Sequence, residues 1–201
     1  MRALLLLSFL LLSSTLHAKK GESSLEQLRV AASVVVVGTV VAVDTLLGIA
    51  TLEVDRTVAG PDRSRLRYRS EPNWACDTVG AELGERTLLF LTGDVGGVME
   101  VAHSGTGRMP LAVRDGHVVA TIEAHNFAPP LDVDILQWNE GSDDAPIRVT
   151  ATPLAQLLDR LARCAAGEAV CADVRGRTAR HVVWGLETDF TSTAARDGLF
   201  P

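Results

Sequence analysis

The chain has 201 residues, of which 47% are hydrophobic, and carries a formal net charge of -6 at pH 7. This length is sufficient for one domain with a substantial core, together with an extension. The acidic balance argues against a general nucleic-acid binder, because affinity for phosphate backbones comes mainly from clustered lysine and arginine.

The first residues, MRALLLLSFLLLSSTLHA, have the layout of a secretory signal peptide. A basic residue precedes an apolar run, and small polar residues lead to Ala18, after which we expect cleavage. An uncleaved membrane anchor is the alternative, but the run is shorter than the ~20 residues of a membrane span. We therefore expect an exported protein (secreted, periplasmic or envelope-associated) that begins at Lys19 and has no stable membrane span.

The stretch VVVVGTVVAV at 34–43 predicts a strand, because valine favours extended structure and the run is only half a membrane span long. A strand that is apolar on both faces has to be covered on both faces. Gly38, near its middle, suits a bulge or bend that lets one long strand pair with two partners.

Four more strands and a hairpin follow from alternating hydrophobicity and turn signals. In RLRYRS we expect Leu66 and Tyr68 to face inward and the three arginines to face outward. The hairpin turns at Asp115 and Gly116. The other strands are expected at 48–57, 65–70, 85–93 and 98–102.

A helix is predicted near 153–164, with Thr152 as its cap and Pro153 at its first position. Its apolar stripe consists of Leu154, Leu157, Leu158 and Leu161. The fold class is therefore mainly β: a five-stranded, OB-like closed barrel, antiparallel throughout, with a C-terminal helix and extension. We expect a signal peptide at 1–18, one domain at 19–170 and an extension at 171–201.

Three cysteines are present, at Cys76, Cys164 and Cys171. In an oxidising compartment the short spacing of Cys164 and Cys171 favours a disulfide between them over a metal site. Pairing of Cys76 with either of the others stays open, because a sequence does not fix connectivity.

The residues that could carry chemistry do not form a known catalytic motif. The histidines lack H-E-x-x-H spacing, and Ser104 beside His103 is not in a G-x-S-x-G elbow. Asp132 and Asp134 share one face of an extended chain but lack further carboxylates at calcium-loop spacing. We expect no catalytic residue, metal or cofactor; the alternative is a metal-dependent enzyme or metal-binding protein that uses His103, His117 or His125.

The order VVVVGTVVAV, ATLEVDRTVAGP, Cys76 and GERTLLFL resembles the netrin-like domain of the tissue inhibitors of metalloproteinases, over about residues 28–115. The matching positions are Val54, Arg56 and Gly60 in one pattern, and Gly84, Leu88, Leu89 and Phe90 in the next. In the animal inhibitors a cysteine is the first mature residue and chelates the zinc of the target enzyme. Here Lys19 stands at that place, so the zinc-chelating mechanism does not transfer.

The resemblance implies the barrel fold and a habit of binding other proteins. We therefore expect an exported, non-catalytic protein-binding module, similar to a proteinase inhibitor, whose partner is an unidentified protein such as a secreted proteinase, and no nucleic acid. The expected contacts, at one end of the barrel, are the N-terminal segment from Lys19 and the loops around Trp74 and His103. A structural envelope protein without a discrete partner is a further alternative.

Overall fold

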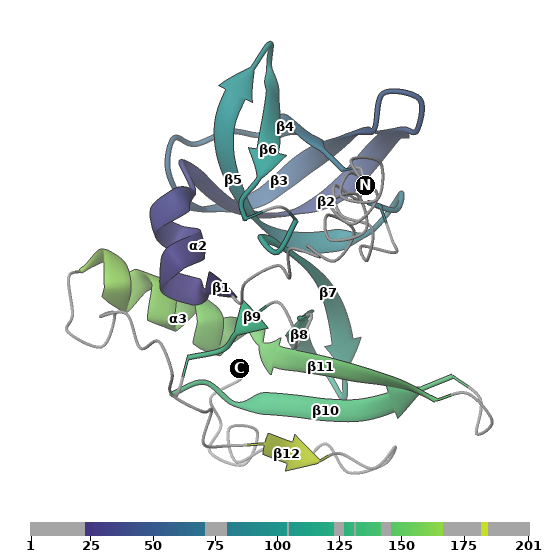
Figure 1. Cartoon of the computed structure of the whole chain (residues 1–201), viewed down its shortest axis with the longest axis vertical. Helices are drawn as coiled ribbons and strands as arrows, with labels where there is room; N and C mark the ends of the chain where they lie inside the picture. Colours follow the sequence, from purple (N-terminus) through teal and green to yellow (C-terminus); the bar gives the residue numbers. More distant parts are fainter. Residues whose placement is uncertain are drawn as a thin grey trace, which may run out of the picture.

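The computed structural model describes residues 23–70, 80–103, 105–122, 127–130, 132–141 and 146–166, and the backbone of residues 182–184. These residues are mainly β, and a closed five-stranded barrel precedes a second group of strands (Figure 1). The barrel strands are β2 (Val34–Asp44), β3 (Ile49–Ala59), β4 (Arg65–Arg69), β5 (Arg86–Val95) and β6 (Val98–Val101). The five strands predicted from the sequence are all present.

Hydrogen bonding in the barrel runs in the order β5-β2-β3-β4-β6 and returns from β6 to β5, which closes the ring. The predicted OB-like closed barrel is confirmed. The expectation that all pairs are antiparallel is wrong for one pair, because β4 and β6 run parallel. The reason is geometric, since a closed ring with an odd number of strands cannot reverse direction at every step.

β2 is buried on both faces, as its valine run predicts. Val34 and Val36 lie in the apolar interior of the barrel. Val35 and Val37 lie in a second cluster outside the barrel wall. The strand pairs with β3 on one side and β5 on the other, and its register to β3 shifts between Val37 and Gly38. The predicted bulge at Gly38 and the two pairing partners are therefore confirmed.

The second group of strands continues the sheet from β5 in the order β7-β8-β11-β10-β12. Its members are β7 (Arg108–Arg114), β8 (His117–Thr121), β10 (Ile135–Glu140), β11 (Ile147–Pro153) and β12 (Val182–Trp184). The predicted hairpin at Asp115 and Gly116 joins β7 to β8. Trp138 is buried in this group, where the Arg114 guanidinium lies 5.5 Å from its ring centroid.

Two helices pack on the outer side of the barrel, in the cluster that holds Val35 and Val37 (Figure 1). They are α2 (Leu25–Ala31) and α3 (Leu154–Ala165). Among the described residues, neither helix has the length and apolar character that crossing a bilayer requires.

The sequence places α3 to within one residue but assigns the wrong cap. Its N-cap is Pro153, which makes no side-chain cap hydrogen bond. Thr152 instead pairs with Ala120 in the β11–β8 ladder, because β11 continues up to the helix. Thr152 is therefore a strand residue, and its buried hydroxyl has no hydrogen-bond partner among the described residues.

α2 and the short strands beside it are elements that the sequence analysis did not predict. Ser24 and Gln27 form a capping box, in which Ser24 N–H donates to Gln27 Oε1 (2.9 Å) and Gln27 N–H donates to Ser24 Oγ (3.2 Å). Leu25 and Leu28 are completely buried. β1 (Ser23–Ser24) leads into the helix and pairs in parallel with β9 (Phe127–Ala128).

Candidate partner-binding surface

His103, the described member of the three predicted contacts, lies on an exposed turn directly after β6. It adopts a left-handed backbone with φ of 50°, which non-glycine residues rarely do. The turn is fixed to β5, because Ala102 N–H donates to Phe90 O (2.9 Å) and Phe90 N–H donates to Gly107 O (2.8 Å). His103 is thus presented on a rigid support.

The ring of His103 contacts the beginning of the described chain. Its Nδ1 lies 3.0 Å from Ser23 Oγ, a hydrogen bond between residues 80 positions apart. The structure therefore brings His103 together with the N-terminal segment, two of the features that the sequence analysis grouped. Lys19 itself lies outside the described residues.

The Ser23–His103 contact is not a catalytic pair. Ser23 is 3% exposed, so its hydroxyl is not accessible to a substrate. The hydrogen bond instead holds β1 against the turn. Ser104, which was considered as a nucleophile beside His103, lies outside the described residues, as does His125.

The opposite end of β2 carries a different exposed feature, the leucine tip, which we define as residues 45–48 between β2 and β3. Leu46 is 94% exposed and Leu47 is 57% exposed. Asp44 Oδ1 accepts hydrogen bonds from the backbone N–H of Leu46 (3.1 Å) and Leu47 (3.0 Å). This carboxylate fixes the backbone of the turn that presents the two leucines to solvent.

The residues that flank Trp74 lie beside the leucine tip. Ser70 N–H donates to Gly48 O (2.9 Å). A Cβ added to Gly80 would lie 3.3 Å from Ser70 O, so the two ends of segment 71–79 are close together. Trp74 itself lies outside the described residues.

Ser70, which precedes segment 71–79, also lies near the end of β6 that leads to His103, because β4 and β6 run parallel with Tyr68 opposite Met99. Val101, two residues before His103, pairs with Leu91 opposite Val34, the first residue of β2. The leucine tip follows Asp44, the last residue of β2. The predicted contacts at one end of the barrel, Lys19, Trp74 and His103, stay a prediction, because Lys19 and Trp74 lie outside the described residues.

Apolar side chains fill the barrel interior, and the ion pair of Arg108 and Glu85 lies near Tyr68. Arg108 Nε donates to Glu85 Oε1 (3.0 Å), and Arg108 Nη2 donates to Gly80 O (2.9 Å). Tyr68 is completely buried near this pair. Burial raises the pKa of its hydroxyl well above its ordinary value; the charge of Arg108 opposes this shift and that of Glu85 adds to it.

The carboxylates considered for metal binding are used to attach α3. Asp132 accepts hydrogen bonds from Arg160 and Arg163, and Asp134 Oδ2 accepts one from Gln156 Nε2 (2.9 Å). In the part of the chain that the structure describes, no three His, Cys, Asp or Glu side chains are grouped so that they could hold a metal ion.

The predicted disulfide partners are only half described. Cys164 is partly buried in the last turn of α3, and Cys171 lies outside the described residues, as does Cys76. The pairing of Cys164 with Cys171 stays a prediction.

No protein-family model matches the chain, and no curated protein matches it. The similarity to netrin-like domains therefore stays a prediction that rests on the residues quoted above.

Proposed function

We propose that the chain is an exported, non-catalytic protein-binding module that acts in the manner of a proteinase inhibitor. Export would follow from the signal peptide at 1–18, and a disulfide between Cys164 and Cys171 would form in that compartment. The closed barrel supports the proposed similarity to netrin-like domains. The positions in the barrel of the residues that match the two netrin-like patterns support it as well. A Cβ on Gly60, for example, would lie 2.4 Å from Ser33 O, so this glycine allows the chain to pass close to the start of β2.

The observation that carries the proposal is the leucine tip. Burying an exposed leucine side chain in an interface contributes roughly 1.5–3 kcal/mol. Because Asp44 already fixes the turn, little conformational entropy is lost when a partner binds it. In the proposal the tip and segment 71–79 with Trp74 form the main contact. The N-terminal segment from Lys19 and His103 form a second contact near the start of β2.

The test is affinity capture from the native secreted or periplasmic fraction, with the chain from Lys19 as bait and mass spectrometry as the readout. The variant L46S/L47S is compared with V113S/I147S, which removes two exposed apolar side chains of the second strand group (71% and 68% exposed). We expect the wild type and V113S/I147S to retain one protein, above all a proteinase, and L46S/L47S to lose it.

The outcomes separate the parts of the proposal. Recovery of no specific protein would overturn the binding-module function. Equal recovery with both variants would leave that function in place and remove the leucine tip from it. A captured proteinase is then assayed with increasing amounts of the chain, and an unchanged rate would contradict inhibition.

A further inference from the structure

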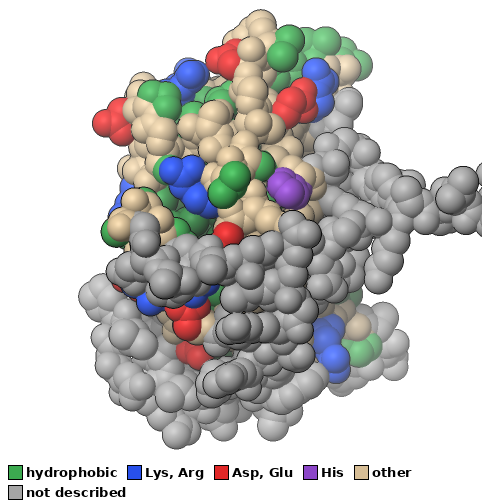
Figure 2. Space-filling view, turned by 60° about the vertical axis from the view of Figure 1, so that its left-hand side comes forward, with side chains coloured by type: hydrophobic (Ala, Val, Ile, Leu, Met, Phe, Trp, Pro, Cys, Tyr) green, Lys and Arg blue, Asp and Glu red, His purple; other side chains and the backbone are tan. Residues whose placement is uncertain are grey.

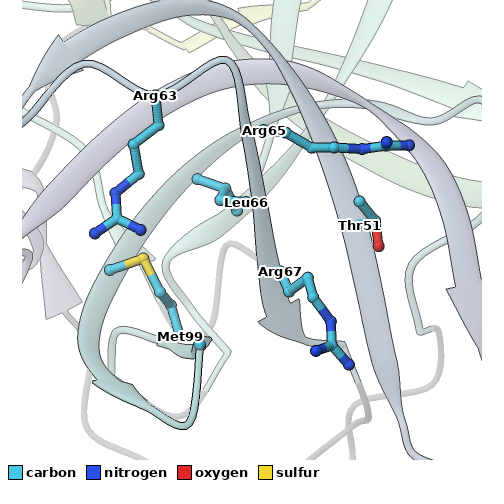
Figure 3. A pocket seen from close by; sticks show the side chains of 7 residues that line it. Thr51, Arg63, Arg65, Leu66, Arg67 and Met99 are labelled. Atoms are coloured by element: carbon cyan, nitrogen blue, oxygen red, sulfur yellow. The ribbon is translucent and has the colours of Figure 1, made fainter.

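An open hollow of about 530 Å³ lies on the barrel where β4 approaches β6 (Figure 3). Three arginines line it, Arg63, Arg65 and Arg67, together with Thr51 of β3 and the apolar side chains of Leu66 and Met99. In Figure 3, Arg63 extends toward Met99, whereas Arg65 and Arg67 extend toward the side of Thr51. The volume is within the range of ordinary ligand sites.

The hollow exists because the barrel closes incompletely at this point. β4 pairs with β3 over five residue pairs, from Ile49↔Arg69 to Glu53↔Arg65. Its ladder with β6 has one pair, Tyr68↔Met99. Among the described residues, the first half of β4 therefore has no neighbouring strand along its outer edge. Such an edge offers N–H and C=O groups to another polypeptide chain.

The positive charge at the hollow is only partly balanced by the described acidic residues, of which Glu53 lies directly opposite Arg65 in the β3–β4 ladder. Arg65 and Arg67 are exposed and form no ion pair or side-chain hydrogen bond with them. Arg63 has Asp94 as a neighbour, but at 3.8 Å. By contrast, Arg69, on the same strand, pairs with Glu100 at 3.0 Å. On the face shown in Figure 2, basic and acidic side chains are interspersed and no large patch of one sign appears.

The spacing of the charges matches that of an extended peptide. Arg65 and Arg67 are two residues apart on a strand, so they lie on the same face, about 7 Å apart. Alternate side chains of an added strand have the same spacing. Guanidinium groups form strong, directional hydrogen bonds to carboxylates.

We propose that this hollow binds an extended acidic segment of a partner protein. The main chain of the segment pairs with the open edge of β4. Its carboxylates, two residues apart, contact Arg65 and Arg67, whose exposed side chains turn toward that edge from the side of Thr51 when the segment binds. The inference rests on the proposed protein-binding function and specifies the chemistry of the partner. A nucleic acid fits less well, because none of the described residues that line the hollow is aromatic and could stack on a base, and because the net charge of -6 repels a long polyanion.

The test is fluorescence anisotropy with the chain from Lys19 and a short labelled peptide in which glutamate and threonine alternate. The variant R65Q/R67Q is compared with R69Q/R86Q, which removes the same net charge from two exposed ion pairs outside the hollow. We expect R65Q/R67Q to bind about 10- to 100-fold more weakly than the wild type. We expect R69Q/R86Q to stay within about threefold, and near-UV circular dichroism to show that both variants are folded.

Three results would overturn the inference. The first is that the wild type does not bind the peptide, and the second is that both variants lose affinity equally. The third is that the wild type binds single-stranded DNA or a sulfated oligosaccharide more tightly than it binds the peptide. Failure here is distinct from failure of the proposed function. If the capture experiment recovers a partner and the peptide does not bind, only the hollow loses its role; if the peptide binds and no partner is captured, the binding-module function fails.

Discussion

Gly38 occupies a position in β2 where a side chain has no room. A Cβ there would lie 2.3 Å from the carbonyl oxygen of Glu53 and 2.8 Å from Leu52 Cδ2. Because the obstacle includes backbone, relief requires β2 and β3 to separate. We expect Gly38→Ala to lower the free energy of unfolding by about 3 kcal/mol, measured by urea denaturation.

The matched control for Gly38 is Gly96→Ala in the β5–β6 turn. A Cβ at Gly96 would meet nothing within 4 Å, and its φ of 64° is left-handed. Only the backbone penalty of about 1 kcal/mol is therefore expected. A loss at Gly38 no larger than at Gly96 would show that β2 can move away from β3 at little cost.

We expect the free energy of unfolding to depend on pH through the carboxyl group of Asp132. Burial alone would raise the pKa of this carboxyl, but the hydrogen bonds from Arg160 and Arg163 outweigh it and lower the pKa below its ordinary value of 3.8. A carboxyl whose pKa is lower in the folded state contributes stability above its ordinary pKa, and this stability is lost as the pH falls through the folded value.

We therefore expect Asp132→Asn to be less stable than the wild type near pH 7, with a difference that shrinks below about pH 4. Urea unfolding of both proteins at a series of pH values measures this difference in the free energy of unfolding. The control is Asp62→Asn, an exposed position with no ion pair among the described residues. A difference between the wild type and Asp132→Asn that stays constant from pH 7 to pH 3 would contradict the linkage.

At the scale of elements, Arg160 of α3 attaches α2 to the rest of the molecule. Its side chain is 4% exposed, and its Nη2 lies 2.7 Å from Glu26 Oε1 on α2. Replacing Arg160 leaves the carboxylate of Glu26, which is 9% exposed, buried without its partner. We expect Arg160→Met to lower the free energy of unfolding by about 3–5 kcal/mol.

The double variant E26L/R160M tests whether the charge of Glu26 is the cause. It removes both buried charges, so most of the lost stability should return. Arg163→Met is the control, because the side chain of Arg163 is 34% exposed and its partners are partly solvated. We expect an effect of about 1 kcal/mol or less there. Equal stability of R160M and E26L/R160M would assign the loss to packing rather than to the unpaired carboxylate.

The elements that the sequence could predict are those whose signals are local. The two-sided valine run of β2, the outward arginines of β4 and the turn at Asp115 are each contained in a few consecutive residues. α2 is only seven residues long, and its anchor on Arg160 comes from 134 positions away, although the capping box of Ser24 and Gln27 could have been noticed. Short helices depend mostly on tertiary packing.

The candidate surfaces were predicted less well, because they depend on closure of the barrel. His103 stays a predicted contact residue, and its hydrogen bond with Ser23 joins residues that nothing in the sequence links. The hollow at Arg65 and Arg67 requires β6 to meet β4 at one residue pair, which alternation along β4 cannot show. The leucines at 46 and 47 are predicted to lie in a turn, but their exposure is known only from the structure.

At the scale of the whole molecule, one apolar cluster joins the barrel to the second strand group. It contains Val35 and Val37 of β2, Phe90 of β5, Ala120 of β8 and Leu157 of α3, all almost completely buried. β5 also hydrogen-bonds to β7, so the two parts share a strand as well as a core. We therefore expect them to unfold in a single cooperative transition.

Two residues report the two parts separately. Tyr68, the single tyrosine of the chain, is buried in the barrel. In the background W74F/W184F, Trp138 is the single tryptophan and is buried in the second strand group. Leu52→Ala, in the barrel interior, should lower the free energy of unfolding by about 2–5 kcal/mol. Tyrosine absorbance and tryptophan fluorescence should shift by the same amount in urea, because the shared cluster transmits the loss. If the tyrosine signal shifts and the Trp138 signal stays, the barrel and the second strand group are separate folding units, and the single domain predicted for residues 19–170 has to be divided.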